Sequence, residues 1–214
     1  MKLKKNKILR ITCDGGAATG KSTGAKLIAK KFGLSFLSSG LLYRYASYMI
    51  IKKNPKNIIN FLKKEFIKLN YKKLNNINLH LPKISEHSAI IAKIPAVRNI
   101  LKKYQKNYIR KNKRCVLEGR DASTKILPNS DVKFFFICSL DIASKRRYKE
   151  LKKNTKKIKL KDVKLAISKR NLMDKNRKLS PLQKHPDAVV VNTGKLNKQA
   201  MLAKMSKYVE KVYK

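Results

Sequence analysis

Residues 15–23 bring glycines and a Lys-Ser pair together at a spacing that suits the binding of phosphate groups. They are Gly15, Gly16, Ala17, Ala18, Thr19, Gly20, Lys21, Ser22 and Thr23. Glycines let the backbone turn tightly, so that several N–H groups point into one concavity. A solvent-facing Lys21 could reach the β- and γ-phosphates of a nucleotide, and the Ser22 hydroxyl could ligate Mg²⁺. The sequence therefore predicts a nucleotide phosphate site.

The segments on either side of this loop are those that a P-loop requires. The apolar run of residues 8–13 predicts a buried strand, and the spacing of Leu27, Ile28 and Phe32 predicts a helix that begins near Lys21. The N-terminus of that helix would add the positive end of its dipole to the phosphate site. The alternative is a glycine-rich turn with an incidental Lys-Ser pair, and the flanking strand and helix argue against it.

Arginine is scarce in this chain, which makes its positions informative. Only ten of the 54 basic residues are arginine, and the others are lysine. Only arginine offers a planar group that can donate two parallel hydrogen bonds to one anion. An arginine that is retained in a lysine-rich chain therefore marks a position where such bidentate binding is expected. Seven of the ten arginines are the positions to examine: Arg44, Arg98, Arg120, Arg146, Arg147, Arg170 and Arg177.

The formal net charge of +42 is typical of proteins that bind nucleic acid. However, the lysines are spread over every polar segment, and aromatic residues do not interleave with them. Lysine, asparagine and isoleucine are used heavily together, which indicates a drift of the whole proteome toward AT-rich codons. We favour this drift, which allows only non-specific contact with nucleic acid, and a dedicated nucleic-acid function stays the alternative.

Chain length and cysteine usage indicate a single cytoplasmic domain. A chain of 214 residues accommodates one α/β domain with insertions. Cys13, Cys115 and Cys138 lie in or beside apolar runs, which predicts unpaired thiols in a reducing compartment. The basic start of the chain, residues 2–5, is followed by an apolar run too short for a leader peptide. No run approaches the ~18 apolar residues of a membrane span, so we expect no membrane contact.

Apolar segments of strand length alternate with helical patterns along the chain. Further strands are predicted at 35–37, 115–118, 132–138 and 188–191, and helices after residue 39, in parts of 52–78, and at 96–111, 143–153, 161–172 and the C-terminus. This alternation predicts an α/β fold with a parallel sheet that helices cover on both faces. Since ligands bind at the carboxyl ends of such strands, the turns at 15–23, 39–44 and 119–121 are expected to converge on one cleft.

Six motifs in a fixed order resemble those of the bacterial cytidylate (CMP) kinases, within the P-loop nucleoside-monophosphate kinases. They are residues 15–23, Ser39–Arg44, Pro95–Arg98, Gly119–Asp121, Arg146–Arg147, and a final set of Arg170, Asp174, Arg177, Pro181 and Leu182. The resemblance covers nearly the whole chain. It implies an NMP-kinase-like core at 1–39, 113–148 and 178–214, a monophosphate-binding insertion at about 40–112 and a short lid at about 149–177.

The resemblance also implies an activity: transfer of the γ-phosphate of ATP to CMP and dCMP, with Mg²⁺, in a monomeric enzyme. Its catalytic residues would be Lys21, Arg120 and Arg170. Residues 15–23 with Arg146 and Arg147 would bind ATP, and Ser22 would hold the metal. CMP would be bound by Ser39, Tyr43, Arg44, Arg98, Arg120, Asp121, Arg170, Asp174 and Arg177. The same fold acting on UMP, and a basic P-loop protein that binds nucleic acid, are the alternatives.

Individual roles within the CMP site follow from the same resemblance. Arg44, Arg120 and Arg170 would hold phosphate oxygens, Asp174 would accept the ribose hydroxyls, and Arg98, Asp121 and Arg177 would surround the cytosine edge. Apart from the resemblance, the place of Glu118 at a strand end beside the cleft leaves two roles open: it would either orient Mg²⁺-bound water or serve as an ordinary strand-end acid. The chain departs from the family at Ser38 (usually Asp), Ala89 (usually Ser, with Ser88 adjacent), Ser123 (usually Gly) and Ala143 (usually Arg). These departures bear on affinity and base selectivity.

Overall fold

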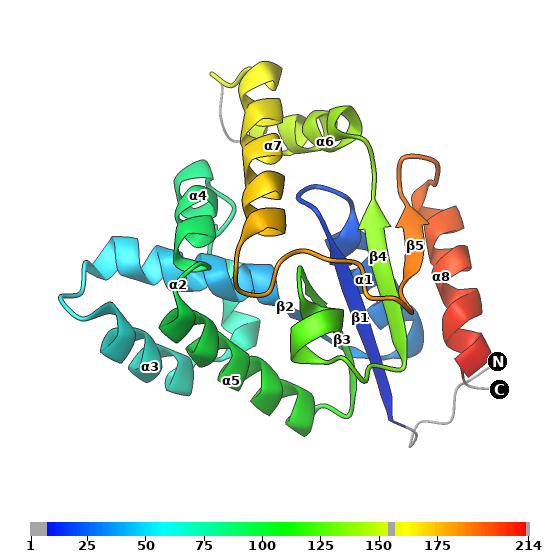
Figure 1. Cartoon of the computed structure of the whole chain (residues 1–214), viewed down its shortest axis with the longest axis horizontal. Helices are drawn as coiled ribbons and strands as arrows, with labels where there is room; N and C mark the ends of the chain where they lie inside the picture. Colours follow the sequence, from blue (N-terminus) through cyan, green and yellow to red (C-terminus); the bar gives the residue numbers. More distant parts are fainter. Residues whose placement is uncertain (1–7, 154–156, 213–214) are drawn as a thin grey trace. The chain divides into compact units, whose positions relative to one another are not determined.

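The structure, a computed structural model that describes residues 8–153 and 157–212, contains a five-stranded sheet (Figure 1). The strands are β1 (Leu9–Gly15), β2 (Ser35–Ser38), β3 (Arg114–Gly119), β4 (Val132–Ile137) and β5 (Val189–Asn192), in the order β2-β3-β1-β4-β5. The pairs β1–β3, β1–β4 and β4–β5 are parallel. The predicted α/β fold is therefore confirmed. The basic start at 2–5 and lid residues 154–156 lie outside the described residues.

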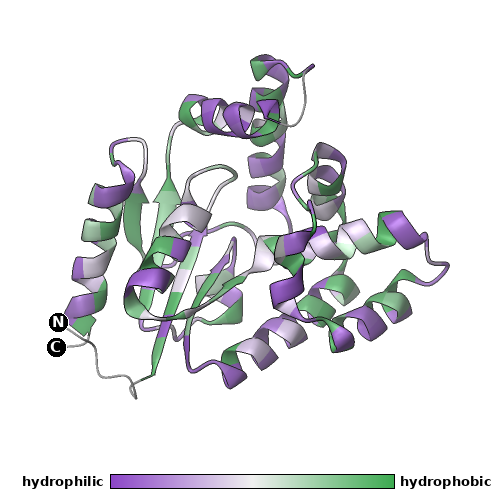
Figure 2. Cartoon of the chain, turned by 180° about the vertical axis from the view of Figure 1, so that it is seen from behind, coloured by the Kyte–Doolittle hydropathy of each residue, from purple (hydrophilic) through white to green (hydrophobic). Residues whose placement is uncertain are grey.

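Two helices pack against the sheet and supply most of its apolar core. Helix α1 (Lys21–Phe32) contributes Ala25 and Ile28, and helix α8 (Lys198–Val212) contributes Met205 and Val209. They meet β4 through Phe134 and Phe136, neither of which is exposed. The sheet strands are largely hydrophobic, with hydrophilic residues interspersed (Figure 2). Such burial of long apolar runs is expected for parallel strands.

Helix α6 (Leu140–Lys152) follows the carboxyl end of β4 and packs against helix α7 (Leu160–Asn176) (Figure 1). The contact between them is apolar and includes Ala143, Val163 and Ile167. Ala143 is the position where the family usually has arginine. Here its methyl group is buried between the two helices, so a long charged side chain would have to displace this packing.

Residues 38–112 form a second compact unit, built only from helices, and residues 8–37 with 113–212 belong to the first. The elements of the second unit are α2 (Ser39–Lys53), α3 (Ile58–Lys68), η1 (Tyr71–Asn76), α4 (Pro82–Ile91) and α5 (Pro95–Lys111). Tyr45, Phe66 and Tyr104 pack edge to face, with ring centroids 5.9 and 5.7 Å apart. Helix α4 was not predicted, because its sequence has little amphipathic pattern.

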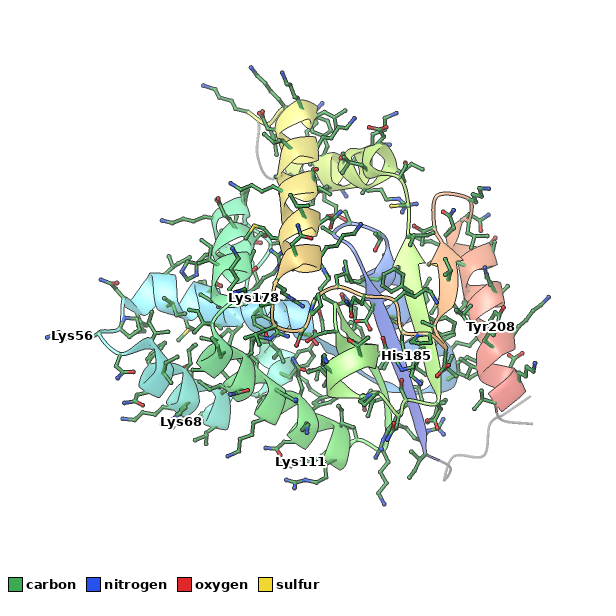
Figure 3. All side chains as sticks on the ribbon, viewed as in Figure 1. Lys56, Lys68, Lys111, Lys178, His185 and Tyr208 are labelled. Carbon is green, nitrogen blue, oxygen red and sulfur yellow. The ribbon has the colours of Figure 1, made fainter. Side chains whose placement is uncertain are left out.

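Exposed lysine side chains lie on every α-helix of the described chain, and several of the exposed lysines are labelled in Figure 3. Lys56, Lys68 and Lys111, which are labelled there, are all exposed in the helical unit. This scatter agrees with the drift interpretation of the charge, since a nucleic-acid groove gathers its cations along one path. Within the described part of the chain, no helix is both long enough and apolar enough to cross a membrane.

Candidate active site

The phosphate loop begins where β1 ends, and its glycines are required by geometry. Gly15 has φ 153°, and a Cβ there would lie 2.5 Å from the Phe136 carbonyl oxygen. Gly20 is left-handed, with φ 80°, and forms the N-cap of α1. No side chain caps that helix. The backbone N–H groups of its first turn are therefore open to an anionic ligand.

Lys21 is buried in the loop, and the prediction that it faces solvent is wrong. Its Nζ donates to the Gly16 carbonyl at 3.0 Å and lies 3.4 Å from Glu118 Oε1 on β3. Only 6% of Lys21 and 2% of Glu118 is exposed. A buried ammonium is tolerated because a carbonyl and a carboxylate compensate it. Glu118 is therefore a charge partner of Lys21, which explains why this strand-end acid lies inside the site.

Burial, reinforced by the charge of Arg120, lowers the pKa of Lys21 to about 8. The free protein then loses this charge as pH rises through about 8, whereas bound phosphates favour the ammonium. We expect ATP to bind with proton uptake at pH 8.5 and with falling affinity above it. Isothermal titration calorimetry in two buffers of different ionisation enthalpy measures the uptake. A buffer-independent enthalpy for the wild type would contradict this prediction; Lys21→Met is the control that should show no uptake.

Ser22 and Thr23 lie exposed in the first turn of α1. A hydroxyl at this place suits Mg²⁺, which usually keeps several waters and takes few protein ligands. Among the described residues no group of three or more His, Cys, Asp or Glu side chains could hold a metal ion. The assignment of Ser22 as a metal ligand stays a prediction.

Arg146 is attached to the phosphate loop through Thr193, just after β5. Its guanidinium donates to the Thr193 hydroxyl and to the Thr193 carbonyl, each at 2.8 Å. The hydroxyl in turn donates to the Thr19 carbonyl at 2.8 Å. The predicted ATP-side residue Arg146 thus lies beside the loop, whereas Arg147 pairs with the exposed Glu150 at 3.1 Å.

Asp174 gathers three of the predicted arginines around one buried carboxylate. Its Oδ2 lies 2.8 Å from Arg120 Nε and 3.4 Å from Arg170 Nε, and its Oδ1 lies 3.4 Å from Arg177 Nη1. Burial alone would raise the pKa of Asp174, but the three guanidinium groups bring it below its ordinary value. Asp174 is therefore ionised and holds the cluster together.

Asp121 completes this cluster, with its Oδ1 3.9 Å from Arg177 Nη2. Three guanidinium groups against two carboxylates leave a net positive charge. Arg120 uses Nε for Asp174 and Nη1 for the Gly119 carbonyl at 3.4 Å. Its Nη2 has no hydrogen-bond partner in the described part of the chain, which leaves one side of the fork open to a phosphate oxygen.

The predicted residues of the helical unit lie at the starts of α2 and α5. Arg98 lies 5.8 Å from the centre of the Tyr43 ring and donates to the Ala92 carbonyl at 3.2 Å. Arg44 contacts His80 Nδ1. The Ser39 hydroxyl is buried without a hydrogen-bond partner among the described residues. Since each unit is described by itself, the predicted convergence of all three turns stays a prediction.

The sequence pattern of the cytidylate kinases matches residues 11–211. The chain belongs to the cytidylate kinase family. It is 35% identical over 212 residues to the cytidylate kinase of Clostridium tetani, with 94% of this chain and 93% of that protein covered. It is 34% identical to that of Thermosipho melanesiensis, with 94% and 96% covered. With that of Caldanaerobacter subterraneus it shares 31% identity, with 96% of each covered. These matches confirm the resemblance.

Two solved structures share the fold of this family member at low sequence identity. An uncharacterized protein of Eubacterium ventriosum has a TM-score of 0.56 at 15% identity, with 96% of this chain and 99% of that chain covered. A protein of Thermus thermophilus has a TM-score of 0.52 at 13% identity, with 95% and 96% covered. At such identities the likeness concerns the fold alone.

Ser38 stands where the family usually has Asp, directly before α2. Its hydroxyl caps α2 by accepting from Leu41 N at 3.2 Å, as an N-cap carboxylate would. The adjacent positions Ser88 and Ala89 are both buried in α4, and the Ser88 hydroxyl donates to the Ser85 carbonyl at 2.7 Å. The Ser38 hydroxyl therefore supplies the helix cap that the family's usual Asp would supply.

Several residues at the site were not predicted from the sequence. Asn171 accepts from Ala17 N at 2.8 Å, so that α7 is attached to the phosphate loop next to Arg170. Thr193 links Arg146 to the loop, and Asp14 is buried at the end of β1. An aspartate inside an apolar strand, directly before the first glycine of the loop, is a signal that could have been noticed. Asn171 and Thr193 carry no comparable signal.

Proposed function

We propose that this chain transfers the γ-phosphate of ATP to CMP and dCMP, producing ADP with CDP or dCDP. The observation that carries the proposal is its membership of the cytidylate kinase family over residues 11–211. The P-loop and the arginine cluster around Asp174 support it. Phosphoryl transfer needs mainly positioning and charge neutralisation, and these two groups can supply both.

The phosphate loop would hold ATP while the arginine cluster holds the acceptor. The N–H groups at the start of α1 and the Lys21 ammonium would neutralise the β- and γ-phosphates, with Lys21 exchanging Glu118 for phosphate oxygens. Arg120 and Arg170 would bind the phosphate of CMP, with Arg44 as a further donor. Mg²⁺, held by Ser22 and the phosphates, would supply further charge neutralisation. No general base is required for a loose phosphoryl transition state.

Closure of a lid at 149–177 would protect the reaction from water, since hydrolysis of ATP competes with transfer. Helix α7 carries Arg170 and Asp174, and Asn171 on the same helix accepts from the phosphate loop. We also propose a cytoplasmic location, because all three cysteines are free thiols. A monomer is proposed from the family resemblance. The scattered lysines support no nucleic-acid contact beyond a non-specific one.

A coupled assay of ADP release tests this function. We expect CMP and dCMP to stimulate ADP release, and AMP and GMP to give none. Stimulation by UMP equal to that by CMP would favour the broader pyrimidine alternative. ADP release that is independent of every monophosphate would contradict the proposal and leave the P-loop with another role.

Asp121 is expected to discriminate between the cytosine of CMP and the uracil of UMP. Cytosine has an amino donor at position 4, whereas uracil has a carbonyl there, so a carboxylate attracts one base and repels the other. Asp121→Asn should lower the preference for CMP over UMP by about 10- to 150-fold, corresponding to about 1.5–3 kcal/mol, because an amide can donate to the uracil carbonyl. The measurement is kcat/KM for both monophosphates at saturating ATP.

The control for this prediction is Asp187→Asn, since 73% of that side chain is exposed, in a different loop. It should leave the CMP-to-UMP ratio at the wild-type value. If the ratio is also unchanged in Asp121→Asn, Asp121 does not contact the base, and its contact with Arg177 is only structural.

A further inference from the structure

Asp14 is a fully buried carboxylate that directly precedes the first glycine of the phosphate loop. It lies on β1 opposite Gly119 of β3, at the point where the chain leaves β3. Its Oδ1 accepts from Ala122 N at 2.8 Å, and its Oδ2 accepts from Ser123 N at 2.7 Å and from Ser123 Oγ at 2.6 Å. One side chain thus connects the start of the phosphate loop to the segment that follows Arg120 and Asp121.

Nothing in the described part of the chain forms an ion pair with Asp14. Burial raises the pKa of Asp14 to about 6, although the three hydrogen bonds oppose this, and the nearby charge of Asp121 raises it further. Cys13, the other titratable neighbour on β1, has a thiol whose pKa is raised by burial and is therefore neutral. A buried carboxylate without a cation costs folding free energy, so a purely stabilising role does not explain it.

We propose that Asp14 and Ser123 together act as positioning residues that hold Arg120 and Asp121 at a fixed place relative to the phosphate loop. This inference rests on the proposed function, in which Arg120 binds the acceptor phosphate and Asp121 the base. The segment of residues 119–123, which leads from the end of β3 into the short π-helix η2 (Ala122–Ile126), is held at two points. Asp14 binds its end at 122–123, and Asp174 binds the Arg120 side chain at 2.8 Å. The segment of residues 119–123 then has little freedom, so Arg120 keeps the acceptor phosphate in line with the γ-phosphate of ATP.

The Ser123 hydroxyl is specific to this arrangement, since the family usually has glycine at this position. It donates the shortest of the three hydrogen bonds and favours the ionised form of Asp14. A protonated Asp14 could no longer accept from all three donors at full strength, so the segment of residues 119–123 would be held less firmly. Activity should therefore fall as pH falls through the pKa of Asp14, and removal of the hydroxyl should move this fall to higher pH.

The variant Ser123→Ala removes only the hydroxyl. We expect kcat/KM for CMP to fall about 3- to 10-fold, mostly in kcat, the scale of one net hydrogen bond. The acid limb of the pH profile should move to higher pH. CMP itself titrates in this range, but that contribution is the same for both proteins and cancels in the comparison. Asp14→Asn should lose more activity, because its NH₂ group would face backbone N–H donors.

The matched control is Ser206→Ala in α8, which removes another buried hydroxyl, one without a hydrogen-bond partner among the described residues. Its kinetics and pH profile should equal those of the wild type. If Ser123→Ala lowers the melting temperature while kcat, KM and the acid limb stay unchanged, Asp14 is structural and the proposal is overturned. If Ser123→Ala does not fold, Ser123→Gly removes the same hydroxyl and is judged by the same outcomes.

Carboxyl NMR of the wild type and Ser123→Ala gives an independent measurement that needs no turnover. The titration midpoint of Asp14 should rise in the variant, and an unchanged midpoint overturns the inference. Failure of the proposed function can be told apart from failure of this inference by the wild type alone. If the proposed function is wrong, the wild type releases no ADP with CMP, whatever the Ser123 variants do.

Discussion

Replacing Lys21 by methionine is expected to lower kcat with CMP by about 10²–10³-fold, the scale for losing one charged donor to the transition state. The methionine keeps the length of the stem but has no donor for phosphate oxygens. In the structure Lys21 lies against the loop carbonyl of Gly16 and against Glu118, so its ammonium is already at the phosphate site. The measurement is the coupled assay at saturating ATP and CMP, with the melting temperature recorded in parallel.

Stability must be separated from catalysis, because the variant removes the cation beside a buried carboxylate. Breaking such a pair costs up to about 3–5 kcal/mol. The double variant Lys21→Met with Glu118→Gln removes both charges and should regain most of the lost melting temperature. Activity should stay low in the double variant. Recovery of activity together with stability would show that Lys21 matters for folding and not for phosphate transfer.

Replacing Arg120 by lysine is expected to lower kcat/KM for CMP by about 10- to 150-fold, although the charge is kept. Arg120 donates through Nε to Asp174 while another side of its fork stays open. A lysine ammonium is a single point that cannot contact Asp174 and a phosphate at once with arginine's geometry. The loss should appear mainly in kcat/KM for CMP and leave KM for ATP nearly unchanged.

The matched control for this prediction is Arg110→Lys, since Arg110 is exposed near the end of α5 and its guanidinium contacts only Asn107 among the described residues. It should behave as the wild type. Wild-type kinetics in Arg120→Lys would mean that its charge alone matters, and the bidentate argument from the scarcity of arginine would fail at this position.

Much of this protein could be predicted from the sequence, because the relevant signals are local. The phosphate loop is contiguous, and its flanking strand and helix follow from apolar spacing within a few residues. The order β-loop-α, the parallel sheet and the helix predicted at 96–111 (α5, Pro95–Lys111) were confirmed for the same reason. The scarcity of arginine singled out Arg120, Arg170 and Arg177, which the structure brings together around Asp174.

Tertiary structure alone decided how these residues are held. Lys21 was expected in solvent, but β3 brings Glu118 beside it. Asp14 and Ser123 are 109 residues apart, and Ala17 and Asn171 are 154 apart, so no pattern within a helix or strand reports their contacts. Local propensities follow from each residue's own backbone and near neighbours. The partner of a buried polar group is chosen only when strands pair and helices pack, because burial is what makes an unpartnered charge costly.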